Sequence, residues 1–448
     1  MAYGGGTWLT QNKVLPGAYI NFTSVSKASA TLSDRGVAAI PLPLAWGPEG
    51  TVFEVTNGDL QKNSMDIFGY SYMDNAMLPL RELFLYAKTA YLYRLTGTTT
   101  KAVAQLGSAT FATAKYGGSR GNAMRLVISA NVDTPSAFDV KIYMGDALVD
   151  EQIGVATAAD LVNSNFATFN PDATLEVTAG VNFTGGGDGT ISGTAWQAAL
   201  DAFEAYSFNT LGCPTDDETT KGLFVQYTKR MRDEVGAKFQ LVGHKIPNAD
   251  YEGVISVEND VSGYPDSVLG MGAFGLVYWM TGAEAGCEVN RSCTNKQYDG
   301  ELTVNTDYTQ KELEDAIKGG KLILHNANGV VRILGDINTL LTLTDTKGEV
   351  FQANQTIRVC DQIANDTAVL FNTRYLGVVP NDASGRMSLW ADICKLIQEL
   401  ERLRAVEDFD TSTLTVEQGD TKKAVVATLQ NLNIVNAMAQ LYMSVIIM

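Results

Sequence analysis

Residues 117–121 have the sequence Gly-Gly-Ser-Arg-Gly, which matches the G-x-S-x-G pattern of a nucleophile elbow around Ser119. Such an elbow needs a strand before the serine and a helix after it, so that the hydroxyl is exposed to substrate. The residues that follow Gly121 alternate as a strand does, and His244 and His325 are the two histidines that could act as a base. The pattern favours a loop, and a serine hydrolase using Ser119 remains an alternative function.

Two other groups have the residue types of a catalytic or metal-binding site. Five residues separate Cys287 from Cys293, without zinc-knuckle spacing or a nearby histidine, which favours buried thiols. The carboxylates at 216–218 could hold a cation or supply an acid and a base, but Thr215 and Glu218 have the spacing of a helix capping box. The sequence therefore predicts no catalytic residue, no metal site and no cofactor.

The glycine-rich segment Gly185–Gly189 could in principle cradle a phosphate ahead of a helix. It lacks the Gly-Lys-Ser/Thr of a P-loop, and its glycines do not satisfy G-x-G-x-x-G. A tight turn between domains is the favoured interpretation.

Composition restricts the partners. Acidic residues outnumber basic ones 50 to 33, giving a net charge of -17, which argues against nucleic acid or an anionic membrane as partner. Five cysteines, an odd number, do not form a disulfide framework and indicate a cytoplasmic product. The N-terminus lacks the regions of a signal peptide. The uncharged stretch between Asp266 and Glu284 is shorter than the ~20 residues of a membrane span, so a buried helix is expected.

The elements around these groups alternate between helix and strand in residues 24–96 and 191–440. Strands are expected at Gly36–Leu42, Thr89–Arg94, Phe239–Val242 and Tyr251–Val257. Helices are expected at Asn75–Tyr86, Thr194–Phe203 and Thr215–Val235, and from a second capping box at Thr309–Glu312 to Gly319–Gly320. A hairpin with an Asn-Gly turn is expected at Lys321–Leu334. The stripe Leu389, Ile393, Leu396, Ile397, Leu400 and Leu403 predicts an amphipathic helix over Ser388–Ala405.

Residues 97–190 have a different sequence pattern from the segments on either side. Short alternating segments, among them Met124–Ser129, Ala137–Tyr143 and Thr174–Thr178, are separated by Gly, Asn, Asp and Pro. We expect an all-β domain inserted into an α/β core that has a mixed sheet with helices.

Both ends of the chain carry apolar segments that favour strands. Residues 441–448 have mostly apolar side chains on both faces of the strand that they would form. A similar segment occupies Ala18–Phe22, after the glycine-rich start Gly4–Gly6. Because an unpaired strand either pairs or aggregates, extended arms are expected at 1–23 and 441–448. Their pairing residues are Ala18, Tyr19, Ile20, Asn21, Phe22, Leu441, Tyr442, Met443, Ser444, Val445, Ile446 and Ile447.

The chain resembles the tail sheath proteins of contractile phage tails and of phage-tail-like bacteriocins from Gram-positive bacteria. The resemblance spans nearly the whole chain and rests on the order and spacing of short segments. These are Leu15–Phe22, Ala114–Asn122, Ala249–Val257, Gly335–Asn338, Ile357–Ala364, Tyr375–Gly377 and the final Leu-Tyr-Met-Ser-Val.

The resemblance implies a structural subunit and no enzymatic activity. Sheath subunits form stacked hexameric rings around an inner tube, and contraction drives the tube through a target envelope. Terminal strands reach into neighbouring subunits, and the partners implied are further copies, the tube protein, and baseplate and tail terminator proteins. The particle would be assembled in the bacterial host cytoplasm. A non-contractile shell protein or adhesin is a further alternative.

The resemblance also implies an inner layer made by the core and the C-terminal region, with the β insertion outside. The helix at 388–405 is the candidate tube-facing element, with Lys395, Glu399, Arg402 and Arg404 exposed; an ordinary core helix with a solvated face is the alternative. The hairpin at Lys321–Leu334 is a candidate acceptor for a neighbour's strands.

Overall fold

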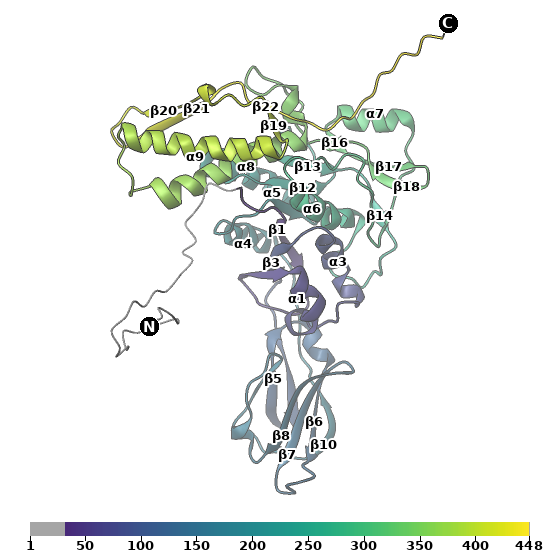
Figure 1. Ribbon diagram of the computed structural model, residues 1–448. Coiled ribbons are helices and arrows are strands. Elements are labelled where there is room, and N and C mark those ends of the chain that lie inside the picture. Colours follow the sequence, from purple (N-terminus) through teal and green to yellow (C-terminus); the bar gives the residue numbers. More distant parts are fainter. Residues whose placement is uncertain (1–31, 448) are drawn as a thin grey trace, which may run out of the picture.

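A seven-stranded sheet forms the centre of the computed structural model, which describes residues 32–447 (Figure 1). The strand order is β16-β13-β12-β11-β1-β3-β2, and β2 alone runs antiparallel to its neighbour. The strands are β1 (Val37–Pro43), β2 (Val52–Thr56), β3 (Thr89–Leu95), β11 (Thr210–Cys213), β12 (Gln240–His244), β13 (Val254–Val257) and β16 (Lys321–Leu322). Apolar runs such as Ala38–Leu42 suit a parallel sheet that is covered on both faces.

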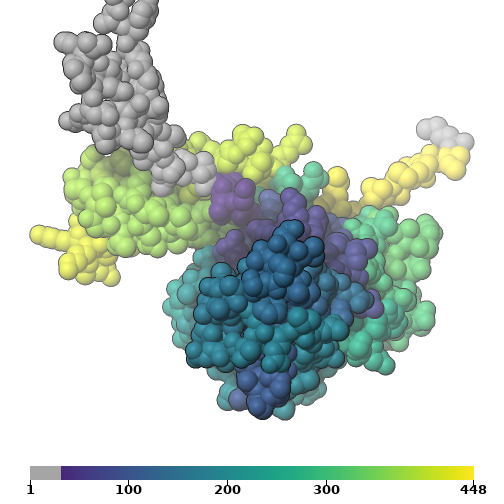
Figure 2. All heavy atoms as spheres, turned by 90° about the horizontal axis from the view of Figure 1, so that it is seen from below, coloured from purple at the N-terminus to yellow at the C-terminus, as the bar shows by residue number. Residues whose placement is uncertain are grey.

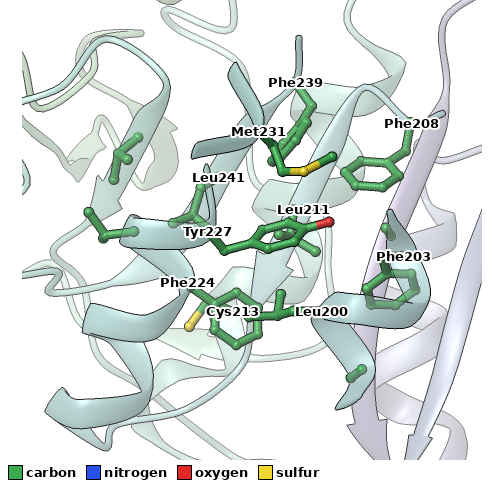
Figure 3. Close-up of a cluster of buried hydrophobic side chains, with 14 of the residues drawn as sticks. Leu200, Phe203, Phe208, Leu211, Cys213, Phe224, Tyr227, Met231, Phe239 and Leu241 are labelled. Carbon is green, nitrogen blue, oxygen red and sulfur yellow. The ribbon is translucent and has the colours of Figure 1, made fainter. Parts of the chain in front are cut away.

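Helices cover both faces of this sheet. On one face lie α3 (Leu78–Phe84) and α6 (Leu276–Gly286), and on the other α4 (Gly193–Phe203) and α5 (Glu218–Arg230). The neighbouring residues Ala38 and Ala39 of β1 belong to different apolar clusters, one on each side. Aromatic rings fill the cluster between α4, α5 and the sheet (Figure 3).

The expected buried helix is confirmed as α6, whose residues from Leu276 to Ala285 are all buried. No helix in the part of the chain that the structure describes is long and apolar enough to span a bilayer. Shorter elements complete this region: α1 (Asn57–Lys62), α2 (Ser64–Phe68), α7 (Gln310–Lys318), β14 (Val261–Ser262) and β15 (Thr303–Val304).

The two expected capping boxes have different outcomes. Thr309 and Glu312 form theirs at the start of α7. The box between Thr215 and Glu218 does not form, because the Asp217 carboxylate caps α5 by accepting the Thr220 N–H over 2.7 Å. Asp217 is therefore the N-cap residue, three positions before the residue whose N–H it accepts, and α5 begins at Glu218.

The inserted residues form a β-sandwich that projects from the α/β core (Figure 1). One sheet has the order β10-β6-β7-β8 and the other β4-β5-β9. Their strands are β4 (Lys101–Leu106), β5 (Ala109–Gly117), β6 (Met124–Ala130), β7 (Phe138–Met144), β8 (Ala147–Val155), β9 (Ala167–Phe169) and β10 (Thr178–Asn182). The strand expected at Thr174–Thr178 is wrong for 174–177, which have no pairing partner; Leu175 packs on the sandwich core without joining a ladder.

Arg94 joins the core to the sandwich. This buried side chain donates to the carbonyl oxygens of Leu44, Gly47 and Gly117, over 2.7 to 2.8 Å. Burial lowers its pKa, and the carboxylates of Glu49 and Asp188 oppose that shift. The tight turn expected at Gly185–Gly189 is wrong: this segment runs antiparallel to the chain at Thr100, and Gly187 and Thr100 exchange two backbone hydrogen bonds.

The C-terminal region packs two long helices against two short sheets. The helices are α8 (Asn354–Leu370) and α9 (Ala383–Arg402), and the antiparallel pairs are β19 (Val406–Glu407) with β22 (Asn433–Ile434) and β20 (Leu414–Gln418) with β21 (Val425–Leu429). The amphipathic stripe on α9 is confirmed, since its members from Leu389 to Leu400 are buried in one cluster. The helix begins earlier than expected because Asp382 caps the Gly385 N–H.

The observed hairpin is shorter than the range expected from the sequence, Lys321–Leu334. Lys321 and Leu322 pair with β13 as β16, so they belong to the central sheet. The hairpin itself is β17 (Leu324–Ala327) with β18 (Val330–Ile333). Its turn uses Asn328 and Gly329, both with positive φ, as an Asn-Gly type I′ turn requires.

Candidate functional site

The C-terminal segment leaves the body of the molecule as an extended, apolar strip (Figures 1 and 2). Residues 435–447 have no strand partner within the described chain. Leu441 and Tyr442 are each 86% exposed, and Ile446 and Ile447 are each 90% exposed. A run of large apolar side chains in water is costly and marks a surface that another molecule covers. The second predicted arm, Ala18–Phe22, lies outside the described residues.

The base of this strip is held in place. The Gln355 side chain, in the first turn of α8, donates to the Val435 carbonyl over 2.9 Å and accepts the Ala437 N–H over 3.0 Å. The Val435 N–H donates to the carbonyl of Ala405. The segment therefore has a fixed direction up to Ala437, beyond which its side chains are in solvent.

A groove of about 710 Å³ runs beside this anchor. It lies between α7, the β17–β18 hairpin and the start of α8, and the segment from Asn436 to Gln440 forms part of its wall. Leu313, Ile317 and Leu334 supply apolar lining. The anchored segment thus borders an open groove in its own subunit.

The β17–β18 and β20–β21 hairpins differ in how open their edges are. The β17–β18 hairpin is covered along β18, because Asn295 and Tyr298 donate backbone hydrogen bonds to Ile333 and Val331. The β20–β21 hairpin packs on α9, where Trp390 Nε1 donates to the Leu414 carbonyl, and no third strand of the described chain joins it.

The predicted tube-facing side chains lie on the solvent side of α9 and at its end. Lys395 and Arg402 are exposed, and Arg404 follows the helix with a positive φ. Glu399 pairs with Arg402 over 2.9 Å within the helix, which lowers the pKa of Glu399. Lys395, Glu399 and Arg402 also line a cleft of about 870 Å³ between α9 and the core, so this face is concave.

A polar stripe on α8 positions the C-terminal region and was missed at the sequence level. Asp361 accepts two hydrogen bonds from Arg232, at 2.6 and 2.8 Å. Arg358 bridges the buried carboxylates of Glu284 and Asp336. Burial raises the pKa of Glu284 well above its usual value, whereas Arg358 helps to hold that of Asp336 low. The sequence does carry a signal for this stripe, because polar residues recur three and four positions apart on a helix that also has an apolar side.

The structure does not assemble the alternative hydrolase site. Ser119 lies in a 3₁₀ turn (Ser119–Ala123) after β5, and its N–H donates to Asp188 over 2.9 Å. His244 lies at the end of β12, where its two ring nitrogens face Asp216 and Asp260 at 2.7 and 3.0 Å. Neither histidine hydrogen-bonds Ser119 in the described part of the chain, so a serine–histidine pair has no support.

Four family models match consecutive parts of the chain. The phage tail sheath protein central domain matches residues 189–339, and the phage tail sheath C-terminal domain matches 346–448. The phage tail sheath protein beta-sandwich domain matches 97–188, and the tail sheath protein Gp18 domain III N-terminal region matches 35–95.

Individual proteins are similar over most of their length. The phage-like element PBSX protein XkdK of Bacillus subtilis is 32% identical over 391 residues, 81% of each chain. The crystal structure of a sheath tail protein from Desulfitobacterium hafniense is 36% identical, has a TM-score of 0.78, and covers 90% of this chain and 93% of its own. The helical sheath of the anti-feeding prophage in its contracted state shares the fold at 12% identity and a TM-score of 0.56, covering 97% of this chain and 99% of its own.

Proposed function

The chain belongs to the phage tail sheath protein family, and from that premise we propose that it polymerises as stacked hexameric rings around an inner tube. It is a component of the tail of a phage or phage-like particle. Contraction of the assembled sheath drives the tube through the envelope of a target cell. The energy for that step is a difference in packing between two assembled states, set during assembly.

The observation that carries this proposal is the anchored, exposed C-terminal strip. Gln355 fixes where the strip begins, and its large apolar side chains from Leu441 onward are solvent-exposed in the single chain. Pairing with a second copy covers these side chains and satisfies a row of backbone groups at once. One strip on every subunit is enough to link a subunit to its neighbour.

The acceptor that we propose is the β20–β21 hairpin in place of the hairpin at 321–334. Residues 295–298 cover the β18 edge of the latter, whereas β20–β21 has no third strand in the described chain. Val426 on β21 is half exposed, so an incoming apolar strand has a side chain to pack against. The segment Ala18–Phe22 of a neighbour would pair in the same way.

The remaining surfaces receive the other partners. We assign the sandwich of residues 97–190 to the outside of the sheath and the charged face of α9 to the tube. Lys395 and Arg402 have side chains 65% and 69% exposed, which suits weak charge contacts that release on contraction. Baseplate and tail terminator proteins would bind at the ends of the stack, and assembly would take place in the bacterial cytoplasm, where the five free cysteines stay reduced.

Deletion of Leu441–Met448 tests the linkage. The truncated chain should stay folded and monomeric under conditions in which the full chain sediments as a polymer. A control that replaces the exposed loop Asp133–Ser136 of the sandwich by a Gly/Ser sequence should still polymerise. Polymers formed by the truncated chain would rule out the C-terminal strip as the link.

A further inference from the structure

At four places in the sequence an Asn or Asp directly precedes a glycine. They are Asn57–Gly58, Asp188–Gly189, Asp299–Gly300 and Asn328–Gly329. Because glycine has no side chain, its backbone nitrogen can approach the side-chain carbonyl carbon of the residue before it, which is the first step of a spontaneous cyclisation. The sequence does not rank these four places, so the fold must decide which of them reacts.

Hydrogen bonds hold the two aspartate side chains. The Asp299 carboxylate accepts from the Tyr86 hydroxyl over 2.6 Å and from Trp279 Nε1 over 2.9 Å. The Asp188 carboxylate accepts the Ser119 N–H over 2.9 Å. Cyclisation at either place would break these contacts, which join separate elements of the fold.

The first asparagine is also held. Asn57 is the first residue of α1, and its backbone N–H donates to the Lys88 carbonyl over 3.1 Å. Its side chain donates to the Phe84 carbonyl over 3.3 Å and accepts from Gln61 Nε2 over 3.0 Å. Reaction at Asn57 therefore requires the first turn of α1 to open and both side-chain hydrogen bonds to break.

Asn328 lies at the exposed tip of the β17–β18 hairpin, with a φ of 54°. No hydrogen bond joins its side chain to another residue between 32 and 447. Gly329 is equally exposed, and a Cβ placed on it would meet no atom within 4 Å. One contact restrains the tip, since the Gly329 N–H donates to Asn326 Oδ1 over 2.7 Å. Because both partners are exposed, the tip can open locally without loss of core packing.

We propose that Asn328 is a deamidation site, at which the folded protein converts this asparagine to aspartate and isoaspartate. The Gly329 backbone nitrogen loses its proton to hydroxide and attacks Asn328 Cγ. The new N–Cγ bond closes a five-membered imide, the Cγ–Nδ2 bond breaks, and the side-chain nitrogen leaves as ammonia with a proton taken from water. A water molecule then opens the imide, giving aspartate by attack at Cγ or isoaspartate by attack at the backbone carbonyl carbon. The net change consumes one water and releases one ammonia.

The modification changes a turn whose geometry is tightly specified. A type I′ turn has two central residues with positive φ, here Asn328 and Gly329, and isoaspartate adds a carbon to the backbone between them. Both products also add a carboxylate. The hairpin borders the groove beside the C-terminal strip through His325, so the reaction alters one wall of that groove. The chemistry itself does not depend on the proposed function.

Peptide mapping of the aged full-length chain tests the proposal. The native protein is held in mildly alkaline buffer, in parallel with a sample denatured in guanidinium chloride, and both are digested with trypsin at intervals. Asn57 lies in the tryptic peptide 36–62 and Asn328 in 322–332, and fragmentation in the mass spectrometer locates the converted residue. Methyl transfer by an isoaspartate methyltransferase identifies the isoaspartate product.

The native and denatured samples should differ in one respect. In the denatured chain the two Asn-Gly pairs should convert at similar rates. In the native chain Asn328 should convert at least about ten-fold faster than Asn57, because two side-chain hydrogen bonds must first break at Asn57.

Two variants check the assignment. Asn328→Gly keeps a residue that the turn accepts and should abolish conversion in peptide 322–332, whereas the control Asn57→Asp should leave that conversion unchanged. The proposal would be overturned if Asn328 of the native wild type kept its amide while the denatured sample converted, or if Asn57 reacted as fast in the native chain. Both comparisons use the wild type, so they are independent of how the variants fold.

Discussion

Gln355 of α8 holds Val435 at the base of the C-terminal strip, through a hydrogen bond of 2.9 Å from its side-chain amide to the Val435 carbonyl oxygen. The same side chain accepts the N–H of Ala437. A helix that is fixed to the core by buried ion pairs therefore also sets the point from which the strip departs. The fold of the subunit therefore sets the direction in which the strip leaves the molecule.

Gln355→Ala should loosen the strip. Each side-chain hydrogen bond contributes about 1 kcal/mol, so exchange of the Ala437 amide hydrogen should be about five-fold faster. Hydrogen exchange followed by mass spectrometry of the C-terminal peptide measures this directly, and polymerisation should slow. Gln398→Ala, on the exposed face of α9, is the matched control. Unchanged exchange at Ala437 would show that Gln355 does not anchor the strip.

Arg94→Met should weaken the attachment of the sandwich to the core. The substitution leaves three carbonyl oxygens without their donor and two carboxylates without their cation, which costs about 3–5 kcal/mol. Urea unfolding of the variant and of the control Arg125→Met, an exposed residue of β6, measures the difference. A loss below about 1 kcal/mol for Arg94→Met would contradict the role assigned to it.

Gly118→Ala should destabilise the same junction for a backbone reason. Gly118 has a φ of 132°, and a Cβ there would lie 2.3 Å from the Ala45 carbonyl oxygen and 2.6 Å from Arg94 Nη2. The backbone strain of an alanine at this φ costs about 1–3 kcal/mol, and the steric clash of its Cβ adds to that cost. Gly193→Ala, at the first residue of α4 with open space around it, should change stability by less than about 1 kcal/mol. Thermal unfolding of both variants gives the comparison.

Glu82 should make the protein less stable as pH rises. Burial raises the pKa of this carboxyl from 4.5 to about 7, so the folded state keeps a proton that the unfolded state releases. Stability therefore falls between these two values, by about 3 kcal/mol, and levels off above them. Glu82→Gln should flatten this decline in urea unfolding measured across the range, whereas the exposed Glu54→Gln should retain it. If the stability of Glu82→Gln fell with pH as steeply as that of the wild type, the proton that the folded state retains would belong to a group other than Glu82.

Local patterns predicted the elements that are set by local physics. The stripe on α9, the Thr309 capping box and the alternation of β6 and β7 each depend on residues a few positions apart, and each formed. Lys321 and Leu322 were assigned to the wrong sheet, because their partner in β13 lies far away in the sequence. The strand expected at 174–177 failed for the same reason, since alternation alone does not supply a neighbour.

The candidate site was predictable only in part. The residues of Leu441–Ile447 are mostly apolar, so the sequence alone indicates that another segment must cover them. Its anchor at Gln355 and the ion pairs of Arg358 join residues tens of positions apart, and no local pattern specifies them.

Electron microscopy of the purified full-length chain in negative stain tests the central claim most directly. If the protein is a contractile sheath subunit linked through its terminal strips, it should form hollow tubes with regular transverse striations, and the chain lacking Leu441–Met448 should form none. Closed shells or isolated monomers from the full-length chain, at concentrations where sheath subunits polymerise, would contradict the account and favour a shell protein or an adhesin.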